Sequence, residues 1–267
     1  MASLWDPKHL TSTRTLQPRE SEEKTLQSFY HATRVRRAPR LHTVETLNLA
    51  KRYPKTEALR GLNFSVRQGE IMVILGPNGS GKTTLLMILC TILKPTSGTA
   101  RIMGLDVVQE GTKVREILGI AFQEARGFWR HKPSSILRFH ASMFGIDSAK
   151  RQNLVEQILK DLELWESRDK MFMHLSGGQA KRLETAKVLL QRPKVAIFDE
   201  PTSQVDLRGK RKIWDKIKAL RDEGSTVIVA TNEVREAEYL ADRVTILHRG
   251  QQVVCDSITT LKDAIAG

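Results

Sequence analysis

The segment from Gly76 to Thr84 constrains the fold of this chain more than any other part of the sequence. It reads Gly-Pro-Asn-Gly-Ser-Gly-Lys-Thr-Thr, which matches the pattern G-x-x-x-x-G-K-[ST] of a phosphate-binding loop. One apolar run, 71–75, precedes it, and a second, 85–89, follows it. This context predicts a buried strand, a glycine-rich turn and a buried helix, in that order.

The residue types in this segment suit phosphate binding. Glycines at 76, 79 and 81 allow the backbone to curl, so that successive N–H groups point at phosphate oxygens. The helix that starts near Lys82 adds the positive end of its dipole. We expect Lys82 to reach the β- and γ-phosphates of a nucleotide and the Thr83 hydroxyl to hold Mg²⁺. A glycine-rich turn without a ligand is the weaker alternative, because the strand, the lysine and the threonine all agree.

Composition narrows the class of protein. The chain has 267 residues, enough for one large domain or a domain with a tail, and a net charge of +13. Such a basic excess indicates binding to nucleic acid, binding to an anionic membrane surface, or no more than an effect on solubility. The sequence contains no aromatic-rich basic motif of a nucleic-acid module, which favours the last two. Two widely spaced cysteines suit a reducing, cytosolic compartment. No apolar stretch reaches about 18 residues, so we expect no transmembrane helix, and no secretory signal is apparent.

The order of patterns along the chain predicts its organisation. Residues 1–40 are polar and mixed in charge, which favours a solvated leader over an arm resting on lipid headgroups. Strands are expected at 43–49 and 62–66, with a connecting segment between them. From 71 onward strands alternate with helices, which predicts a parallel sheet with right-handed crossovers. The stretch 124–175 shows helical periods and no strand, which predicts an inserted helical lobe. Within this lobe, a helix over 134–145 is expected to be capped by Ser134 or Ser135.

Three further features suggest binding or catalysis. Ser176, Gly177 and Gly178 open a helix, where a capping serine and bare N–H groups form a second anion site. The apolar run 195–198 ends in two adjacent carboxylates, Asp199 and Glu200, which are costly to place there unless a cation is nearby. Because side chains alternate along a strand, one carboxylate can hold Mg²⁺ while the other faces a reacting water. Tyr53 could stack on a nucleotide base, although a tyrosine in a strand more often packs.

Taken in order, these motifs resemble those of an ATP-binding-cassette (ABC) ATPase subunit, over roughly residues 43–260. The five-residue signature Leu-Ser-Gly-Gly-Gln at 175–179, beside a complete phosphate loop, is the most specific feature. The motifs that carry the resemblance are Tyr53, Gly76–Thr84, Gln123, Leu175–Gln179, Val195–Glu200 and Ser203–Asp206.

The resemblance implies a fold and its boundaries. The expected fold is α/β, a phosphate-loop (RecA-like), mostly parallel sheet with an N-terminal antiparallel β subdomain and an inserted helical lobe. We expect a polar N-terminal extension over 1–40, an ABC ATPase domain over 41–267, and the helical lobe at about 124–185.

The resemblance also implies roles for individual residues. Thr83 and Asp199 would hold Mg²⁺, Gln123 would touch the Mg²⁺ and the attacking water, and Glu200 would be the general base. The signature residues would contact the γ-phosphate of ATP bound to the opposite subunit, since a head-to-tail pair closes two sites at once. The candidate ATP-binding residues are Tyr53, Gly76, Pro77, Asn78, Gly79, Ser80, Gly81, Lys82, Thr83, Thr84, Ser176, Gly177, Gly178, Gln179 and Asp206.

One catalytic position departs from the family pattern. Asn232 stands where the family usually has a histidine that reaches the γ-phosphate. Asparagine donates hydrogen bonds but reaches less far and carries no charge. We therefore expect slow ATP hydrolysis rather than none, because Glu200 is present.

The leading functional hypothesis is a transport ATPase that pairs with an integral membrane permease and with a second ABC subunit, most simply an identical copy. It would lie on the cytoplasmic face of the membrane. The stretch 47–84 is similar to the drug-resistance and natural-product exporter branch.

Phe128 and Trp129 either dock the permease or pack within the lobe. An ATPase acting on nucleic acid or the ribosome is the alternative, although the chain lacks a second cassette and a long coiled coil. A third hypothesis, a non-hydrolysing ATP sensor, rests on Asn232 alone.

Overall fold

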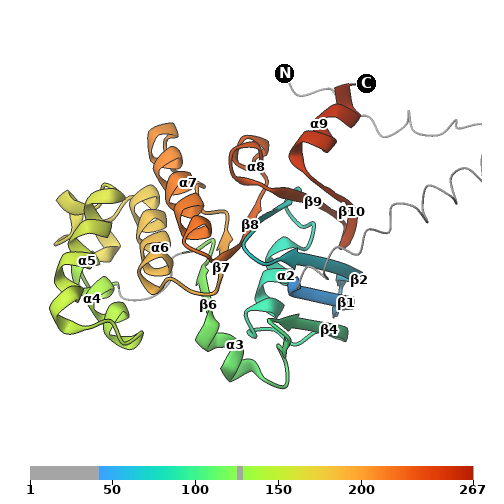
Figure 1. Cartoon of the computed structure of the whole chain (residues 1–267), viewed down its shortest axis with the longest axis horizontal. Helices are drawn as coiled ribbons and strands as arrows, with labels where there is room; N and C mark the ends of the chain where they lie inside the picture. Colours follow the sequence, from blue (N-terminus) through green and yellow to red (C-terminus); the bar gives the residue numbers. More distant parts are fainter. Residues whose placement is uncertain (1–41, 125–128, 267) are drawn as a thin grey trace, which may run out of the picture. The chain divides into compact units, whose positions relative to one another are not determined.

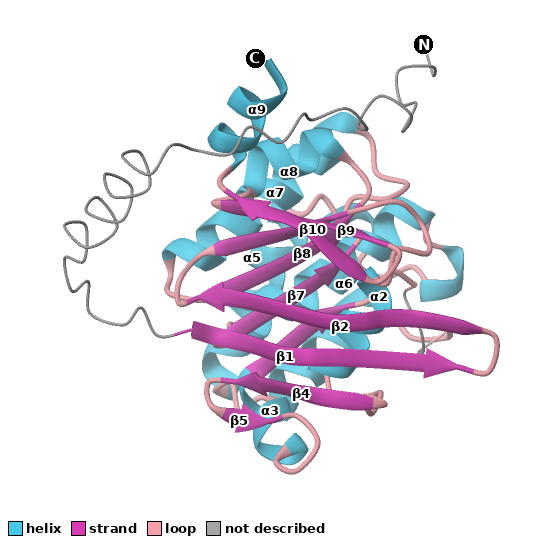
Figure 2. Ribbon diagram, turned by 90° about the vertical axis from the view of Figure 1, so that its right-hand side faces the viewer, coloured by secondary structure: helices cyan, strands magenta, loops and turns pink. Residues whose placement is uncertain are grey.

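The computed structural model describes residues 42–124 and 129–266, and the expected extension over 1–40 lies outside them. The strands of this part form two sheets, one of four strands and one of six (Figures 1 and 2). Helices form most of the segments that connect successive strands along the chain. No helix in the described ranges is long and apolar enough to cross a bilayer.

The first sheet is antiparallel and follows the order β2-β1-β4-β5. Its two long strands extend beyond the predicted ranges, because the segment expected to connect them is itself strand from Thr56 onward. Register shifts along the β1–β2 pair, with Asn48 at a φ of 48°, let the two strands continue pairing over their whole length. The strands are β1 (His42–Tyr53), β2 (Thr56–Arg67), β4 (Ser97–Ile102) and β5 (Leu105–Asp106).

The second sheet follows the order β10-β9-β3-β8-β7-β6, and all neighbours are parallel except β9 and β10. Its central strands are buried on both faces, which explains their unbroken apolar sequences. The strands are β3 (Ile71–Leu75), β6 (Leu118–Ala121), β7 (Val195–Asp199), β8 (Thr226–Thr231), β9 (Arg243–His248) and β10 (Gln251–Asp256).

The strand near residue 100 does not follow the alternation predicted from 71 onward. It pairs antiparallel with β1 and belongs to the first sheet. Its burial explains the difference: Ala100 and Ile102 are buried while Arg101 is exposed. A strand with one wet face suits an antiparallel sheet, whereas a central parallel strand is apolar throughout.

The helices begin and end largely where the apolar periods predict. One cap differs: α4 starts at Pro133 after Lys132, so the prediction that Ser134 or Ser135 caps it was wrong. Proline at the first helical position already has the required φ and needs no amide partner. Between β6 and β7 the described residues form helices and no strand, and the limits of a separate lobe stay a prediction. The helices are α2 (Lys82–Leu89), α3 (Gly111–Ile117), α4 (Pro133–Met143), α5 (Ser148–Asp161), α6 (Gly177–Gln191), α7 (Leu207–Asp222), α8 (Val234–Leu240) and α9 (Ile258–Ala266), with 3₁₀ turns at Trp165–Ser167 and Phe172–His174.

The six-stranded sheet separates two apolar clusters. Alternate residues of β3 supply each side: Ile71 and Val73 join one cluster, whereas Met72 and Ile74 join the other. The first cluster contains residues of α4 to α8, and the second contains α2 and the antiparallel sheet (Figure 1). This three-layer packing fixes the carboxyl ends of β3, β6, β7 and β8, where the candidate site lies.

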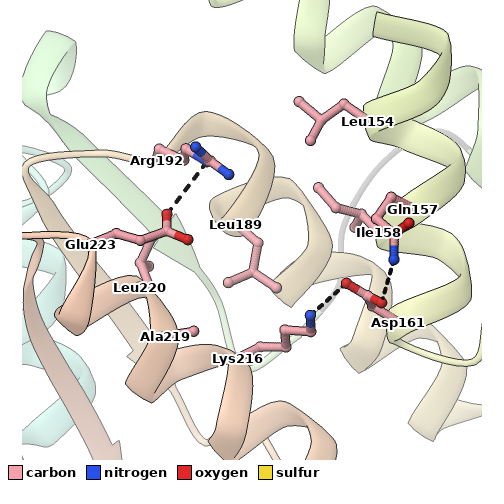
Figure 3. Close-up of a pocket in the computed structure, with 10 residues that line it drawn as sticks. All are labelled: Leu154, Gln157, Ile158, Asp161, Leu189, Arg192, Lys216, Ala219, Leu220 and Glu223. Carbon is pink, nitrogen blue, oxygen red and sulfur yellow. Dashed lines mark hydrogen bonds and ion pairs between the residues drawn. The ribbon is translucent and has the colours of Figure 1, made fainter. Parts of the chain in front are cut away.

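A small hollow of about 130 Å³ lies between α5, α6 and α7 (Figure 3). Apolar side chains such as Leu189 line it, and two ion pairs cross it, Lys216 with Asp161 and Arg192 with Glu223. The hollow is smaller than the roughly 300 Å³ of a typical ligand pocket, so we assign it no ligand. Its contacts hold α6 between α5 and α7.

Candidate active site

The phosphate loop connects β3 to α2 in a conformation that requires glycine. Gly81 caps α2 with a φ of 107°, and a Cβ there would lie 2.5 Å from the Ala58 carbonyl oxygen. A Cβ on Gly76 would lie 2.3 Å from the Leu247 carbonyl oxygen. Because real Cβ atoms do not approach backbone oxygens so closely, neither glycine can be replaced without moving the loop.

Lys82 lies against the loop. Its Nζ donates to the carbonyl oxygens of Gly76, at 2.8 Å, and Pro77, at 3.2 Å. Burial lowers the pKa of Lys82, and the nearby carboxylates of Glu200 and Asp199 oppose that shift. The ammonium is thus held among oxygen atoms at the start of the helix, where phosphate oxygens can replace the carbonyls.

The neighbouring threonine contacts the first carboxylate. Thr83 Oγ1 donates to Asp199 Oδ2 at 3.0 Å, and Asp199 is 1% exposed. The other oxygen, Oδ1, is buried and has no hydrogen-bond partner in 42–124 and 129–266. Burial raises the pKa of Asp199, and the Thr83 hydrogen bond works against that rise. An orphaned carboxylate oxygen beside a hydroxyl fits a Mg²⁺ ion, which one or two carboxylates bind together with phosphates and waters.

Glu200 follows β7 directly and has a different side-chain partner from Asp199. Gln123 Nε2 donates to Glu200 Oε2 at 2.9 Å. The two residues are 77 positions apart, and they meet because β6 and β7 are parallel neighbours. Glu200 has a φ of 48°, a conformation that costs roughly 1–3 kcal/mol in a residue with a side chain. The two adjacent carboxylates thus bond to different residues, Asp199 to Thr83 and Glu200 to Gln123.

Several predicted residues share one cleft of about 480 Å³, a volume typical of ligand sites, which lie between about 300 and 1,000 Å³. Tyr53 is 41% exposed there, with Lys51 Nζ 5.4 Å from its ring centroid. The predicted residues that line the cleft are Tyr53, Asn78, Gly79, Gly81, Lys82, Thr83, Thr84, Gln123 and Glu200. The arrangement has room for a base at Tyr53 and phosphates at the loop.

The cleft also contains residues that the sequence did not single out. Arg60 from β2 and Arg249 from the β9–β10 turn line it. The backbone N–H of Gly250 donates to the Ser80 carbonyl oxygen at 2.9 Å, which joins this turn to the phosphate loop. No local motif marks Arg249, because only the pairing of β9 with β3 brings the turn to the loop.

The signature residues begin α6, outside this cleft. Ser176 is the N-cap, as predicted: its Oγ accepts from the backbone N–H of Gln179 at 3.2 Å, and Gln179 Oε1 accepts from the backbone N–H of Ser176 at 3.0 Å. Gly177 lines a second cavity, together with Gln123, Glu200 and Gln204. Ser176, Gly178 and Gln179 line neither the cleft nor this second cavity.

Two other predicted residues lie at helix and strand ends. Asp206 caps α7, and its Oδ1 accepts from the backbone N–H of Gly209 at 2.7 Å. Its role in ATP binding stays a prediction. Asn232 is exposed just after β8, and its Nδ2 donates to Asn78 Oδ1 of the phosphate loop at 3.4 Å. Asn232 is therefore next to the expected phosphates.

The sequence analysis also missed a buried carboxylate behind the site. Glu236 of α8 is 1% exposed, and its Oε1 accepts from Thr202 Oγ1 at 2.9 Å and from Trp214 Nε1 at 2.7 Å. It thereby joins α7 and α8 to the segment that follows Glu200. Burial raises the pKa of Glu236.

Comparisons with known proteins agree with this geometry. The family model described as ABC transporter matches residues 59–203. The daunorubicin/doxorubicin resistance ATP-binding protein DrrA of Streptomyces peucetius is 33% identical over 222 residues, which are 83% of this chain and 67% of that protein.

Solved structures also match. The dimeric ATP-binding cassette MJ0796, bound to ADP and Pi in a post-hydrolysis state, has a TM-score of 0.75 at 27% identity and covers 80% of this chain and 98% of its own. The protein cbiO1 of Clostridium perfringens, part of the transporter complex cbiONQ, has a TM-score of 0.71 at 29% identity, with coverage of 84% and 93%. The chain belongs to the ABC transporter family, as an ATP-binding subunit that hydrolyses ATP to drive transport.

Proposed function

We propose that this chain is the ATPase subunit of an exporter, that its membrane pathway is a separate permease, and that it works as a dimer at the cytoplasmic face of the membrane. One observation carries the dimer. The phosphate loop, Gln123 and Glu200 share a cleft, whereas Ser176 and Gly178 lie outside it at the start of α6. A second copy related by two-fold symmetry would place each α6 terminus against the other copy's ATP. The related cassette MJ0796 is dimeric.

Within one subunit, the proposed roles follow the contacts. The loop N–H groups and Lys82 bind the β- and γ-phosphates, and Thr83 with Asp199 Oδ1 would hold Mg²⁺. The chemistry that Mg²⁺ supplies when bound is neutralisation of charge on these phosphates. Glu200 accepts the proton of the attacking water, and the amide of Gln123 orients both the carboxylate and that water.

Tyr53 is proposed to stack on the adenine base. Replacing it with alanine should weaken ATP binding by about 5–150-fold, because stacking on an aromatic ring contributes roughly 1–3 kcal/mol per base. Titration with a fluorescent ATP analogue measures the change. Tyr53→Phe retains the ring and is the matched control, with near-native affinity expected. An unchanged Kd in Tyr53→Ala would show that the tyrosine only packs in the sheet.

Export is supported by the similarity to a drug-resistance ATP-binding protein. The relative DrrA is named for daunorubicin and doxorubicin resistance, and cbiO1 is part of a multi-subunit transporter. We therefore propose a cargo of the drug or natural-product class that crosses through the permease. The test is to look for a polytopic membrane protein in the neighbouring reading frames and to co-express it with this chain. Co-purification with ATPase activity that responds to cargo is expected, and a chain that never joins any permease would contradict the proposal.

An exposed apolar patch is proposed to dock the permease. Trp129 is 65% exposed and Met173 is 52% exposed, and both line the cavity that contains Gln123. The ring of Trp129 meets Phe172 edge-on, with centroids 6.3 Å apart. The other predicted docking residue, Phe128, lies outside the described residues. Exposed apolar patches of this kind mark protein contacts.

Trp129→Ala should uncouple transport. We expect basal ATP turnover of the isolated chain to stay unchanged, because Trp129 does not line the cleft that contains Tyr53 and Lys82, while cargo export by the reconstituted complex falls severalfold. Paired transport and ATPase assays measure both. Phe144→Ala removes an exposed aromatic side chain at the end of α4 and serves as control. Equal loss of both activities would instead indicate that Trp129 supports the fold.

A further inference from the structure

Lys181 on α6 is a buried lysine that the roles proposed above do not use. It is 6% exposed, and its Nζ lies 3.3 Å from the Phe122 carbonyl oxygen and 3.4 Å from the Asp199 carbonyl oxygen. Burying an ammonium is costly unless oxygen atoms surround it. The position of this lysine therefore needs an explanation beyond helix packing.

The two carbonyls that Lys181 contacts belong to the residues immediately before Gln123 and Glu200. One follows β6 and the other ends β7, so a single ammonium bridges the ends of two neighbouring strands. Gln123 and Glu200 are themselves joined at 2.9 Å, and Lys181 lines the same cavity as both. Any shift of the ammonium would change the spacing of the strand ends that carry the catalytic pair.

Acidic groups surround Lys181. The charges of Asp199, Glu200, Glu184 and Glu236 favour its protonated form, whereas burial lowers its pKa. Glu184 also pairs with Lys187, at 2.6 Å, on the same helix. The ammonium thus lies in the field of these carboxylates, and its two hydrogen bonds go to backbone carbonyl oxygens.

Lys181 lies in the second turn of α6, the helix that Ser176 caps. The capping box fixes the start of α6, and the helix packs on α4, β6, α5 and α7. We propose that Lys181 is a positioning residue that couples the two ATP sites of the dimer. When the N-terminus of α6 binds the partner's ATP, Lys181 positions the two backbone carbonyl groups that it contacts. The positions of these carbonyl groups in turn orient Gln123 and Glu200 of the same subunit. This inference rests on the dimer proposed above.

The test is Lys181→Met, compared with Lys181→Arg and with Lys113→Met as a control, because Lys113 is an exposed lysine of α3 that pairs with Glu110. We expect Lys181→Met to lower kcat by about 10–100-fold, because small misplacement of catalytic groups has effects of that size. ATP affinity should stay near the native value, because Lys181 does not line the cleft that contains Tyr53 and Lys82. The Hill coefficient for ATP should fall toward 1. Lys181→Arg, which keeps the charge and its donors, should recover most of kcat and the cooperativity.

Mixed dimers locate the effect. With Lys181→Met in one subunit and Glu200→Gln in the other, the subunit that keeps Glu200 carries the altered lysine, so turnover should fall by the same factor of about 10–100. With both changes in one subunit, the competent site retains its lysine, and turnover should persist with altered ATP dependence. Equal rates in the two arrangements would overturn the inference.

Two further outcomes would also overturn it: unchanged kcat and cooperativity in Lys181→Met, or a lowered melting temperature with equal loss of binding and turnover in both Lys181 variants. Failure of the dimer proposal is distinguishable, because Glu200→Gln alone would then form no ATP-dependent dimer.

Discussion

Replacing Glu200 with glutamine should reduce ATP turnover by about 10²–10⁴-fold, the usual contribution of a general base. The variant should also trap ATP between two copies of the chain. Glutamine matches glutamate in shape and can still bond to Gln123, whose amide presently donates to Glu200 Oε2 at 2.9 Å. Glutamine cannot accept a proton from the attacking water. ATP binding and dimer formation should therefore remain, whereas ATP hydrolysis, which lets the two copies separate, should be lost.

Two measurements test this result. Size-exclusion chromatography or light scattering should show that the Glu200→Gln variant is a dimer with Mg-ATP and a monomer without Mg-ATP. A phosphate-release assay should show the loss of turnover. Glu223→Gln removes an exposed carboxylate paired with Arg192 and is the matched control, with native behaviour expected in both assays. A Glu200→Gln chain that turns over normally would remove Glu200 from the role of base. A chain that loses turnover but never dimerises would contradict the shared site.

The parts of the fold that were predicted correctly have strong local signals. The phosphate loop fixes the β3–α2 unit, the apolar run before Asp199 fixes a buried strand, and Ser176 is followed three residues later by Gln179, which fixes a helix start. In each case the residues that decide the conformation are neighbours in sequence. The capping box, for example, needs only the four residues from 176 to 179.

The features that were missed depend on contacts between distant segments. The membership of β4 in the antiparallel sheet is decided by its pairing with β1, about fifty residues earlier. The approach of Arg249 to the cleft needs β9 beside β3, and the burial of Lys181 needs β6, β7 and α6 together. A lysine after the signature looks like a solvent-exposed residue, because most lysines are exposed. Only the assembled sheet shows that its ammonium faces carbonyls.

Replacing Asn232 with histidine should raise ATP turnover. Asn232 directly follows β8 and donates to Asn78 of the phosphate loop at 3.4 Å, so a longer side chain there can reach the phosphates. Loss of one catalytic donor typically costs about 10²–10³ in rate, and asparagine retains part of that role, so we expect a gain of about tenfold. Steady-state kinetics at saturating Mg-ATP measure the change in kcat.

The reason for any gain can be resolved with a third side chain. Asn232→Gln lengthens the side chain without adding charge, because a carboxamide is not protonated, whereas an imidazole can be. This variant therefore distinguishes an effect of side-chain length from an effect of charge. If charge matters, the histidine variant gains activity that declines as pH rises through the pKa of its ring, while the glutamine variant gains little. If reach alone matters, the two variants behave alike at every pH. A histidine variant no faster than the native chain would show that hydrolysis here does not depend on a donor at this position, and that Glu200, Gln123 and the loop set the rate.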